Sequence, residues 1–155
     1  MRSKGKATVM SAEQNKALLR ESYEAIFNQH DIGRAGEFYA PDYLDHGAAP
    51  GQAPALDGAK QKWAGYIAGV PDLRRTIEEM IAEGDKVAVA WTAEGTHEGE
   101  LLSIAATGKY FRFSGMSIYR LTDGKIAEQR EWWDRLDLMR QLGVLPGPGD
   151  NYEGR

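Results

Sequence analysis

The sequence contains no cysteine, which excludes every site that depends on a thiol. Disulfides, thiol nucleophiles, iron–sulfur clusters and thiolate zinc sites all belong to that group. Histidine is also scarce, since only His30, His46 and His97 are present. A histidine-rich metal site would need nearly all of them together with carboxylates, so we expect no metal site.

The sequence has neither an excess of basic residues nor a long hydrophobic run. Its 19 Lys and Arg are scattered and are outnumbered by 23 Asp and Glu, whereas nucleic-acid binders carry a basic stripe. No stretch is long and apolar enough to span a membrane, and residues 1–7 are basic without the apolar segment of a signal peptide. We therefore expect no nucleic-acid partner, no membrane partner and, given the missing cysteines, a cytoplasmic location.

What the sequence does contain is enough apolar material for one core. Its 155 residues, 42% of them hydrophobic, fall in the size range of a single domain. We place that domain at residues 12–145. We expect residues 1–11 to form a mobile N-terminal segment, and residues 146–155, which are rich in proline and glycine, to form a mobile tail.

Apolar residues at helical spacing predict helices over residues 12–29, 33–39, 57–70 and 136–142. Ser11 and Asp57 are suited to cap the first and third of these, because a short polar side chain can accept hydrogen bonds from first-turn N–H groups. Proline ends the second and third, since the residue before a proline is pushed away from helical angles. Residues 47–56 hold two prolines and two glycines and indicate a loop.

Segments rich in β-branched and aromatic residues predict strands over residues 73–82, 86–96, 110–121 and 125–133. Turn sequences at residues 83–85 and 122–125 imply hairpins and therefore antiparallel pairing. In residues 87–91 both alternating sets are apolar, so we expect the sheet to be covered on each side, with a pocket or a partner on the second face. Helices followed by a meander indicate an α+β domain with its helices packed on one face of the sheet.

The last predicted strand carries the leading candidate for chemistry. Period-two alternation places Glu131 on the same face as Trp133, and Ile126 with Trp132 on the other. A carboxyl group walled by indoles is poorly hydrated, and desolvation raises its pKa toward the range of a general acid or base. The alternative is a surface carboxylate paired with an arginine close in sequence, Arg130 or Arg135.

Other polar candidates each have a structural alternative. Asp134 lies where the strand gives way to the final helix, so it is either a catalytic carboxylate or the N-cap of that helix. His46 follows Asp45 and is either a base oriented by a carboxylate or a residue that closes a turn. His97, at a strand end, is equally open. Most aromatic side chains are explained by core packing, but a few can line a small-molecule cavity.

Several stretches together resemble the SnoaL-like polyketide cyclases, also described as ester cyclases, which share the cone-shaped fold of nuclear transport factor 2. The similarity spans nearly the whole chain and rests on the order and spacing of its pieces. Residues 15–31 match the family's opening helix, 40–46 its loop and 70–73 the entry to its sheet. The remaining pieces are residues 82–87, 95–97, 118–120, 123–126 and 133–143.

The resemblance implies a curved antiparallel sheet and N-terminal helices that enclose a pocket. It also implies an intramolecular aldol closure without metal or cofactor, in which a carboxylate on the last strand is general acid and base. Glu131 matches that position, where characterised cyclases have aspartate, and Ser117 matches a pocket histidine of some members. The family also includes members that hydroxylate or only bind ligands, and a fold alone does not fix a function.

We therefore expect a cyclase or isomerase acting on a polyketide-like or other activated carbonyl compound, with Glu131, His46 and Asp134 as catalytic candidates. The predicted substrate-binding residues are Tyr43, Asp45, Trp63, Trp91, His97, Phe113, Ser117 and Trp133. The alternatives are a cofactor-free hydroxylase or hydrolase in the same pocket, or a non-catalytic ligand-binding module. The apolar second face of the sheet predicts a homodimer or homotetramer.

Overall fold

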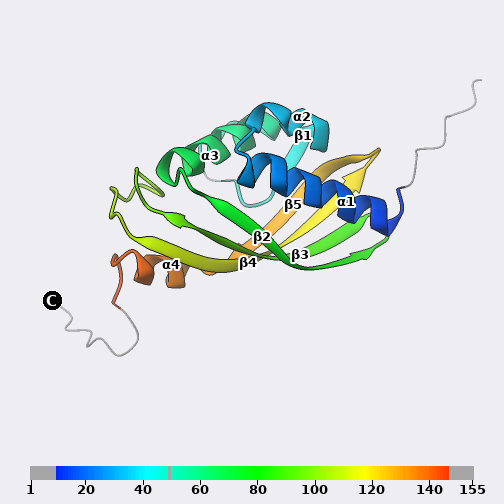
Figure 1. The fold of residues 1–155 in the computed structure, drawn as a ribbon. Coiled ribbons are helices and arrows are strands. Elements are labelled where there is room, and N and C mark those ends of the chain that lie inside the picture. The colour runs from blue at the N-terminus through cyan, green and yellow to red at the C-terminus, as the bar shows by residue number, and fades with distance from the viewer. Residues whose placement is uncertain (1–9, 49, 147–155) are drawn as a thin grey trace, which may run out of the picture.

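The computed structural model describes residues 10–48 and 50–146. The predicted mobile segments, residues 1–11 and 146–155, lie almost wholly outside this part of the chain, and the domain boundaries stay a prediction. Among the described residues, no helix is both long and apolar enough to cross a membrane. Figure 1 shows helices laid across one face of a curved sheet.

The helices follow the predicted order. Ser11 caps the first of them as predicted: its hydroxyl accepts from the backbone N–H of Gln14, whose side chain in turn accepts from the N–H of Ser11. The predicted cap at Asp57 is wrong, because that helix begins two residues earlier, directly after Pro54, and Asp57 lies in its first turn. The helical elements are α1 (Ala12–Tyr23), a π-helical turn (Glu24–Asn28), a 3₁₀ turn (Ile32–Arg34), α2 (Ala35–Phe38), α3 (Ala55–Gly69) and α4 (Arg135–Gln141).

The sheet has five strands in the order β1-β5-β4-β3-β2. The four predicted strands are present and pair antiparallel in sequence order. Because the connections between them are short, each strand lies beside the next one in the chain. The strands are β1 (Tyr39–Asp45), β2 (Arg74–Glu83), β3 (Lys86–Thr96), β4 (Tyr110–Thr122) and β5 (Lys125–Trp133).

Strand β1 differs from the sequence prediction, which gave this segment to a helix end and a loop. It pairs with β5 in parallel, so the sheet is mixed rather than purely antiparallel. Pro41 lies within it and cannot donate to a ladder, which suits a strand at the edge of a sheet. The predicted α+β class is confirmed, and β1 places Asp45 beside the last strand, where Asp45 pairs with Gln129.

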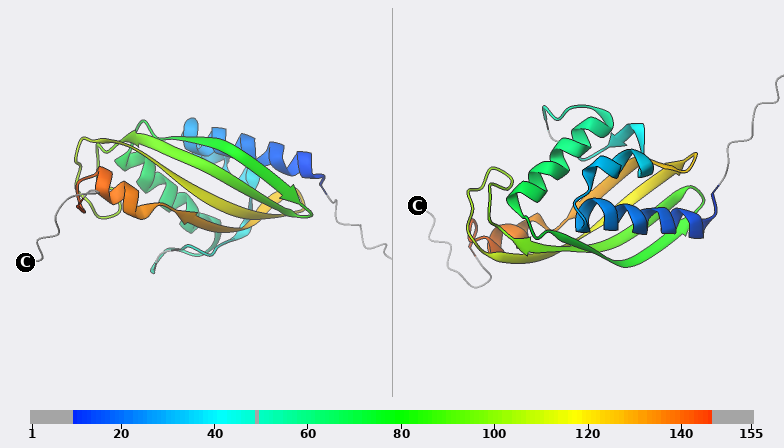
Figure 2. Two further views of the ribbon diagram at one scale, coloured as in Figure 1. Left: turned by 90° about the horizontal axis from the view of Figure 1, so that it is seen from below. Right: turned by 45° about the horizontal axis from the view of Figure 1, so that its top comes forward.

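One face of the sheet is covered and the other is open within this chain. Along β3, Val87, Val89 and Trp91 are buried beneath the helices. On the other face, Met116 is 47% exposed and Trp132 56% exposed. Figures 1 and 2 show α1, α2 and α3 on the covered side, with α4 beyond the end of β5. The expected cover on the second face is therefore not supplied by the described residues.

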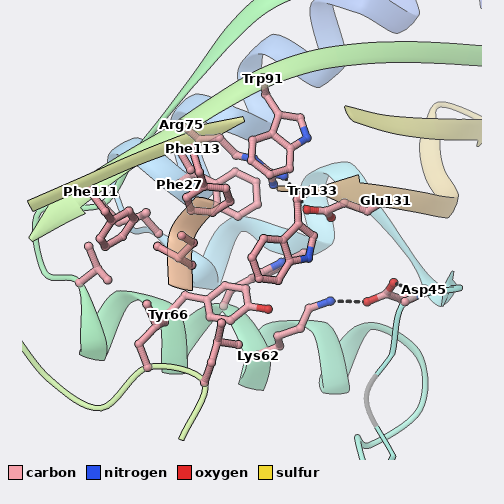
Figure 3. Close-up of a pocket in the computed structure, with 18 residues that line it drawn as sticks. Phe27, Asp45, Lys62, Tyr66, Arg75, Trp91, Phe111, Phe113, Glu131 and Trp133 are labelled. Atoms are coloured by element: carbon pink, nitrogen blue, oxygen red, sulfur yellow. Dashed lines mark hydrogen bonds and ion pairs between the residues drawn. The ribbon is translucent and has the colours of Figure 1, made fainter. Parts of the chain in front are cut away.

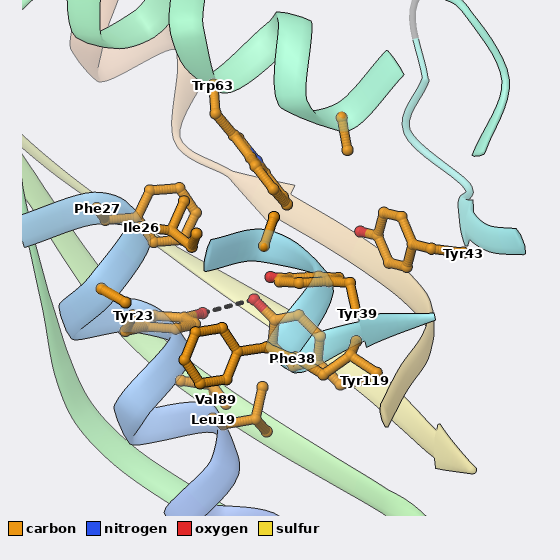
Figure 4. Packing of buried hydrophobic residues seen from close by; sticks show 14 of the residues in the cluster. Leu19, Tyr23, Ile26, Phe27, Phe38, Tyr39, Tyr43, Trp63, Val89 and Tyr119 are labelled. Carbon is orange, nitrogen blue, oxygen red and sulfur yellow. Dashed lines mark hydrogen bonds between the residues drawn. The ribbon is translucent and has the colours of Figure 1, made fainter. Parts of the chain in front are cut away.

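Under α1 and α2 the interior is filled by a group that we call the tyrosine core: Leu19, Tyr23, Ile26, Tyr39 and Tyr119. Each of these side chains is at most 1% exposed. The hydroxyls of Tyr23 and Tyr119 hydrogen-bond each other at 2.7 Å, which satisfies two polar atoms in an otherwise apolar region (Figure 4).

Candidate active site

The end of the sheet that α3 covers encloses a cavity of about 140 Å³ that is partly open to solvent. Its walls are mainly apolar, with several aromatic rings, and its floor is the covered face of β3, β4 and β5 (Figure 3). Six of the predicted site residues line it: Asp45, Trp63, Trp91, Phe113, Glu131 and Trp133. Apolar walls with a few convergent polar groups are the usual composition of a small-molecule site.

Strand β5 brings Glu131 into the cavity next to Trp133, as the alternation predicted. The predicted grouping of Ile126 with the outward residues is wrong. The register of β5 against β4 shifts at Ala127, which adds one residue to β5, and Ile126 is fully buried. A bulge of this kind changes the phase of the alternation, so only residues after it, from Glu128 to Trp133, keep the predicted faces.

Both carboxylate oxygens of Glu131 have a hydrogen-bond partner. Oε1 accepts from a terminal nitrogen of Arg75 at 2.8 Å, and Oε2 accepts from the side-chain amide of Gln129. The hydroxyl of Tyr43 donates to the oxygen of that amide at 2.7 Å, which fixes its orientation. The side chain of Glu131 is still 21% exposed. Each carboxylate oxygen can accept a second hydrogen bond, so Glu131 keeps capacity for a ligand.

Arg75 is the partner that the sequence did not indicate. It comes from β2 and is 8% exposed, and its guanidinium lies 3.6 Å from the ring centroid of Trp91 and 4.6 Å from that of Phe27. Its Nε has no hydrogen-bond partner among the described residues. A buried arginine stays charged, so the Glu131 carboxylate and the aromatic faces supply its compensation. Glu131 is thus paired with an arginine, but inside the cavity rather than at the surface.

Helix α3 forms the opposite wall and presents Lys62 and Tyr66 to the cavity, one helical turn apart (Figure 3). The ammonium of Lys62 pairs with the carboxylate of Asp45. The hydroxyl of Tyr66 makes no hydrogen bond to any described residue, although its ring lines the cavity. Burial, with a smaller contribution from the charge of Glu131, raises the pKa of Tyr66 to about 12. Tyr66 is therefore a neutral hydroxyl donor at physiological pH.

Two predicted catalytic residues lie outside the residues that line the cavity. His46 pairs with Glu128, a β5 residue whose alternation directs it away from Glu131, and Glu128 also accepts from Arg120 at 2.8 Å. These two hydrogen bonds, that of Arg120 first, lower the pKa of Glu128 to about 2. The carboxylate of Asp134 accepts from the N–H of Asp137 at 3.0 Å and caps α4. Roles for His46 and Asp134 in the reaction stay predictions.

Three predicted binding residues lie behind the cavity walls. The hydroxyl of Ser117 accepts from the indole N–H of Trp91 at 2.9 Å and fixes that ring. His97 is fully buried, with one ring nitrogen 2.9 Å from the hydroxyl of Thr107 and the other against a backbone carbonyl. Tyr43 reaches Glu131 only through Gln129. Their position supports the wall residues, and direct binding by them stays a prediction.

A glycine on β4 sets the depth of the cavity. Gly115 pairs with Trp91 on one side and with Trp133 on the other. A Cβ atom at this position would lie 2.3 Å from a ring atom of Trp91, which is far inside van der Waals contact. The indole therefore lies against bare backbone, a close approach that only glycine permits.

The cavity offers no recognisable metal-binding cluster. Among residues 10–48 and 50–146, no three His, Cys, Asp or Glu side chains gather as a possible metal site. Its charged groups are two carboxylates and two cations, in the pairs Asp45–Lys62 and Glu131–Arg75. The site is thus equipped for hydrogen bonding and proton transfer by side chains.

Comparison with known proteins identifies the family of this chain. Residues 17–142 match the family model described as SnoaL-like polyketide cyclase. The aklanonic acid methyl ester cyclases DauD of Streptomyces sp. (strain C5) and DnrD of Streptomyces peucetius are each 34% identical over 134 residues, which is 81% of this chain and 80% and 88% of theirs. The structure of TsrD from Streptomyces laurentii superposes with a TM-score of 0.82 at 26% identity, covering 88% of this chain and 99% of that one.

The chain belongs to the SnoaL-like polyketide cyclase family. The family and the cyclase type of enzyme predicted from the sequence are confirmed. AclR from Streptomyces galilaeus, for which a hydroxylase activity has been suggested, is also similar, with a TM-score of 0.77 and 28% identity over 88% of this chain and 85% of that one. Membership of the family therefore does not fix the reaction, which depends on the residues of the cavity.

Proposed function

We propose that this protein closes a ring in a polyketide-derived methyl ester by intramolecular aldol addition, with Glu131 as general base and then general acid. The observation that carries the proposal is the placement of Glu131. It is a carboxylate held at both oxygens, with residual exposure, in an aromatic cavity of a cyclase-type enzyme. Named relatives act on aklanonic and nogalonic acid methyl esters, and these compounds define the class of substrate to test.

In the first step Glu131 removes the proton from a carbon that lies between two carbonyl groups. The C–H bond breaks, the proton moves to a carboxylate oxygen, and the electron pair is delocalised as an enolate. The enolate carbon then attacks a second carbonyl carbon of the same molecule, forming the new C–C bond and an alkoxide. The proton returns from Glu131 to the alkoxide, so the reaction needs no co-reactant and releases no by-product.

Arg75 and Gln129 have a positioning role in this scheme. They hold the carboxylate of Glu131 toward the cavity, and Tyr43 in turn holds Gln129. The Trp91 and Trp133 rings also line the cavity, and a substrate packed against them would displace water that could protonate the enolate. Precise placement matters because a displacement of about 1 Å can cost about a hundredfold in rate.

The test is Glu131→Gln, which keeps the size of the side chain and removes the base. Turnover of aklanonic acid methyl ester is expected to fall by roughly 10²-fold or more, which is the usual contribution of a general base. Glu131→Asp is the second variant, since it keeps the charge that pairs with Arg75 and withdraws it by one methylene. Circular dichroism and thermal unfolding check that each variant is folded.

Glu128→Gln is the matched control. Glu128 lies on the same strand and is also paired with an arginine, but it faces away from the cavity. This variant is expected to keep wild-type turnover. If a folded Glu131→Gln enzyme turned over at the wild-type rate, the acid–base role of Glu131 would be refuted.

A hydroxylase reaction is the second candidate, favoured by the similarity to AclR. It would place an oxygen atom from O₂ in the product, whereas the aldol closure leaves the mass of the substrate unchanged. Mass spectrometry of the product formed under ¹⁸O₂ separates the two reactions. A mass gain from the labelled oxygen would replace the aldol proposal.

The open face of the sheet supports a homodimeric assembly. Met116 and Trp132 lie there, and Ile81, also a large apolar residue of the sheet, is 63% exposed. Exposed apolar patches commonly mark association surfaces, and a second copy of the chain is the simplest cover. Sedimentation at micromolar concentration is expected to give a dimer, and Trp132→Lys to give a monomer. A wild-type monomer would contradict the assembly.

A further inference from the structure

The α3 wall of the cavity carries two hydrogen-bond donors that the proposed acid–base scheme does not use. Lys62 and Tyr66 face Glu131 across the space, and both line the cavity (Figure 3). The hydroxyl of Tyr66 has no hydrogen-bond partner among the described residues. The ammonium of Lys62 has three protons and pairs with Asp45, so it retains donors for a ligand.

Two donors on the sheet side of the cavity are already engaged. The indole N–H of Trp91 donates to Ser117, and the terminal nitrogen of Arg75 donates to Glu131. The unpartnered Nε of Arg75 belongs to a guanidinium stacked against the ring of Trp91. The neutral hydroxyl of Tyr66 therefore faces the cavity without a partner among the described residues, and internal hydrogen bonding does not explain its position.

The chemistry of carbonyl compounds gives these donors a use. When a proton is removed next to a carbonyl group, the negative charge gathers on the carbonyl oxygen, and donors placed around that oxygen stabilise it. The base must reach the proton on the reacting carbon while the donors reach the neighbouring carbonyl oxygen, so the two sets of groups occupy different parts of the site. Glu131 on the sheet and Tyr66 with Lys62 on α3 have this relation.

We infer that Tyr66 and Lys62 form an oxyanion site that binds the enolate oxygen of the substrate, with Tyr66 as the neutral donor and Lys62 as the charged one. This inference rests on the proposed function and adds the group that receives the charge. The raised pKa of Tyr66 agrees with it, because a hydroxyl that keeps its proton through neutral pH can donate to an anion. Lys62 also brings a positive charge toward the anion, while Asp45 holds it at the wall.

The inference is tested with 4-nitrophenolate, a planar aromatic oxyanion whose absorbance shifts when its oxygen accepts a hydrogen bond. At pH 8 the wild-type protein is expected to bind it with such a shift. Tyr66→Phe should weaken binding roughly 10-fold, as expected for a hydrogen bond to a charged acceptor, and Lys62→Gln by a similar factor. Nitrobenzene, which has the same ring without the oxyanion, should bind wild type and Tyr66→Phe equally.

Tyr110→Phe is the matched control, because it also removes a tyrosine hydroxyl but at a residue that is 59% exposed and outside the cavity lining. It should bind the phenolate as wild type does. The oxyanion site is overturned if the wild type does not bind 4-nitrophenolate, if Tyr66→Phe binds it unchanged, or if Tyr66→Phe loses nitrobenzene to the same extent.

The outcome can be separated from that of the proposed function. With aklanonic acid methyl ester, Tyr66→Phe should lower kcat about 100-fold with little change in KM, the effect of losing one oxyanion donor. Glu131→Gln should abolish turnover but retain phenolate binding, since it leaves both donors in place. If Glu131→Gln is active and binds phenolate through Tyr66, only the acid–base role of Glu131 is refuted and the oxyanion site stands. If Glu131→Gln is inactive and Tyr66→Phe is fully active, only the oxyanion site is refuted and the acid–base role of Glu131 stands.

Discussion

The two ends of the interior are built from similar aromatic side chains but differ in what lies between them. In the tyrosine core the rings fill the space, and the hydroxyls of Tyr23 and Tyr119 pair with each other. Around the cavity, Trp91, Phe113 and Trp133 surround open volume, and the charged groups form ion pairs. Aromatic content alone therefore does not distinguish a core from a binding site. The two regions are distinguished by the buried charged residue at the boundary between them, Arg75.

Arg75 lies at that boundary. Its guanidinium is 5.1 Å from the ring centroid of Tyr23, on the side of the tyrosine core, and 3.6 Å from that of Trp91, on the side of the cavity. A buried cation cannot be surrounded by apolar packing on every side, so it needs the carboxylate of Glu131. The filled and the hollow parts of the molecule thus meet at an ion pair.

The largest expected effect contrasts a leucine from each region. Leu19→Ala in the tyrosine core should lower the free energy of unfolding by about 4 kcal/mol, because it leaves a void among fully buried side chains. Leu102→Ala, in the cavity lining, should cost about 1 kcal/mol or less, since it widens a space that is already open. Urea denaturation measures both. Equal losses would show that the cavity is packed as tightly as the core.

The next effect concerns the boundary itself. Arg75→Met should lower the free energy of unfolding by about 3 kcal/mol, because Glu131 keeps its charge in the cavity without its cation. Adding Glu131→Gln to that variant should restore at least half of the loss, since no unpaired charge remains. Chemical denaturation of the two single variants and the double variant forms the cycle. A double variant less stable than Arg75→Met would contradict this account.

The smallest effect is on pH dependence and compares the ion pair in the cavity with the outward one on the same strand. The pKa of Glu128 is lowered from 4.5 to about 2, by Arg120 first and then His46. A lowered folded-state pKa stabilises the fold above the unfolded value, and the contribution is lost as pH falls through about 2. Thermal unfolding between pH 2 and 6 should therefore show a shallower acid decline in Glu128→Gln than in wild type. Parallel curves would mean that the pair contributes nothing.

Local sequence signals account for most of the fold. Helical spacing, the cap at Ser11, the cap at Asp134 and the hairpin turns all depend on residues within a few positions of each other, and all appear in the structure. Strand β1 was missed because Pro41 argues against a strand and because parallel pairing with β5 leaves no turn between the partners. The bulge at Ala127 was missed because it changes register without changing composition.

The neighbours of Glu131 could be predicted from the sequence only along its own strand. The shared face of Glu131 and Trp133 follows from alternation, and Gln129 could have been added by the same rule, two residues earlier. Arg75 is 56 positions away from Glu131, and nothing in its neighbourhood marks it as buried. Lys62 and Tyr66 are four residues apart on a helix, which puts them on one face, but only the tertiary packing turns that face toward Glu131.

Trp91 lies so close to Gly115 that the size of the cavity depends on this glycine, although the glycine has no side chain to line it. A larger residue there would have to displace the indole or the backbone of β5, since its Cβ would also lie 2.8 Å from the carbonyl oxygen of Trp132. Variants that accept shorter or longer carbon skeletons could thus be made by substituting this glycine, which a survey of cavity-lining side chains would overlook. Gly115→Ala is accordingly a starting point for changing which substrates the cavity admits.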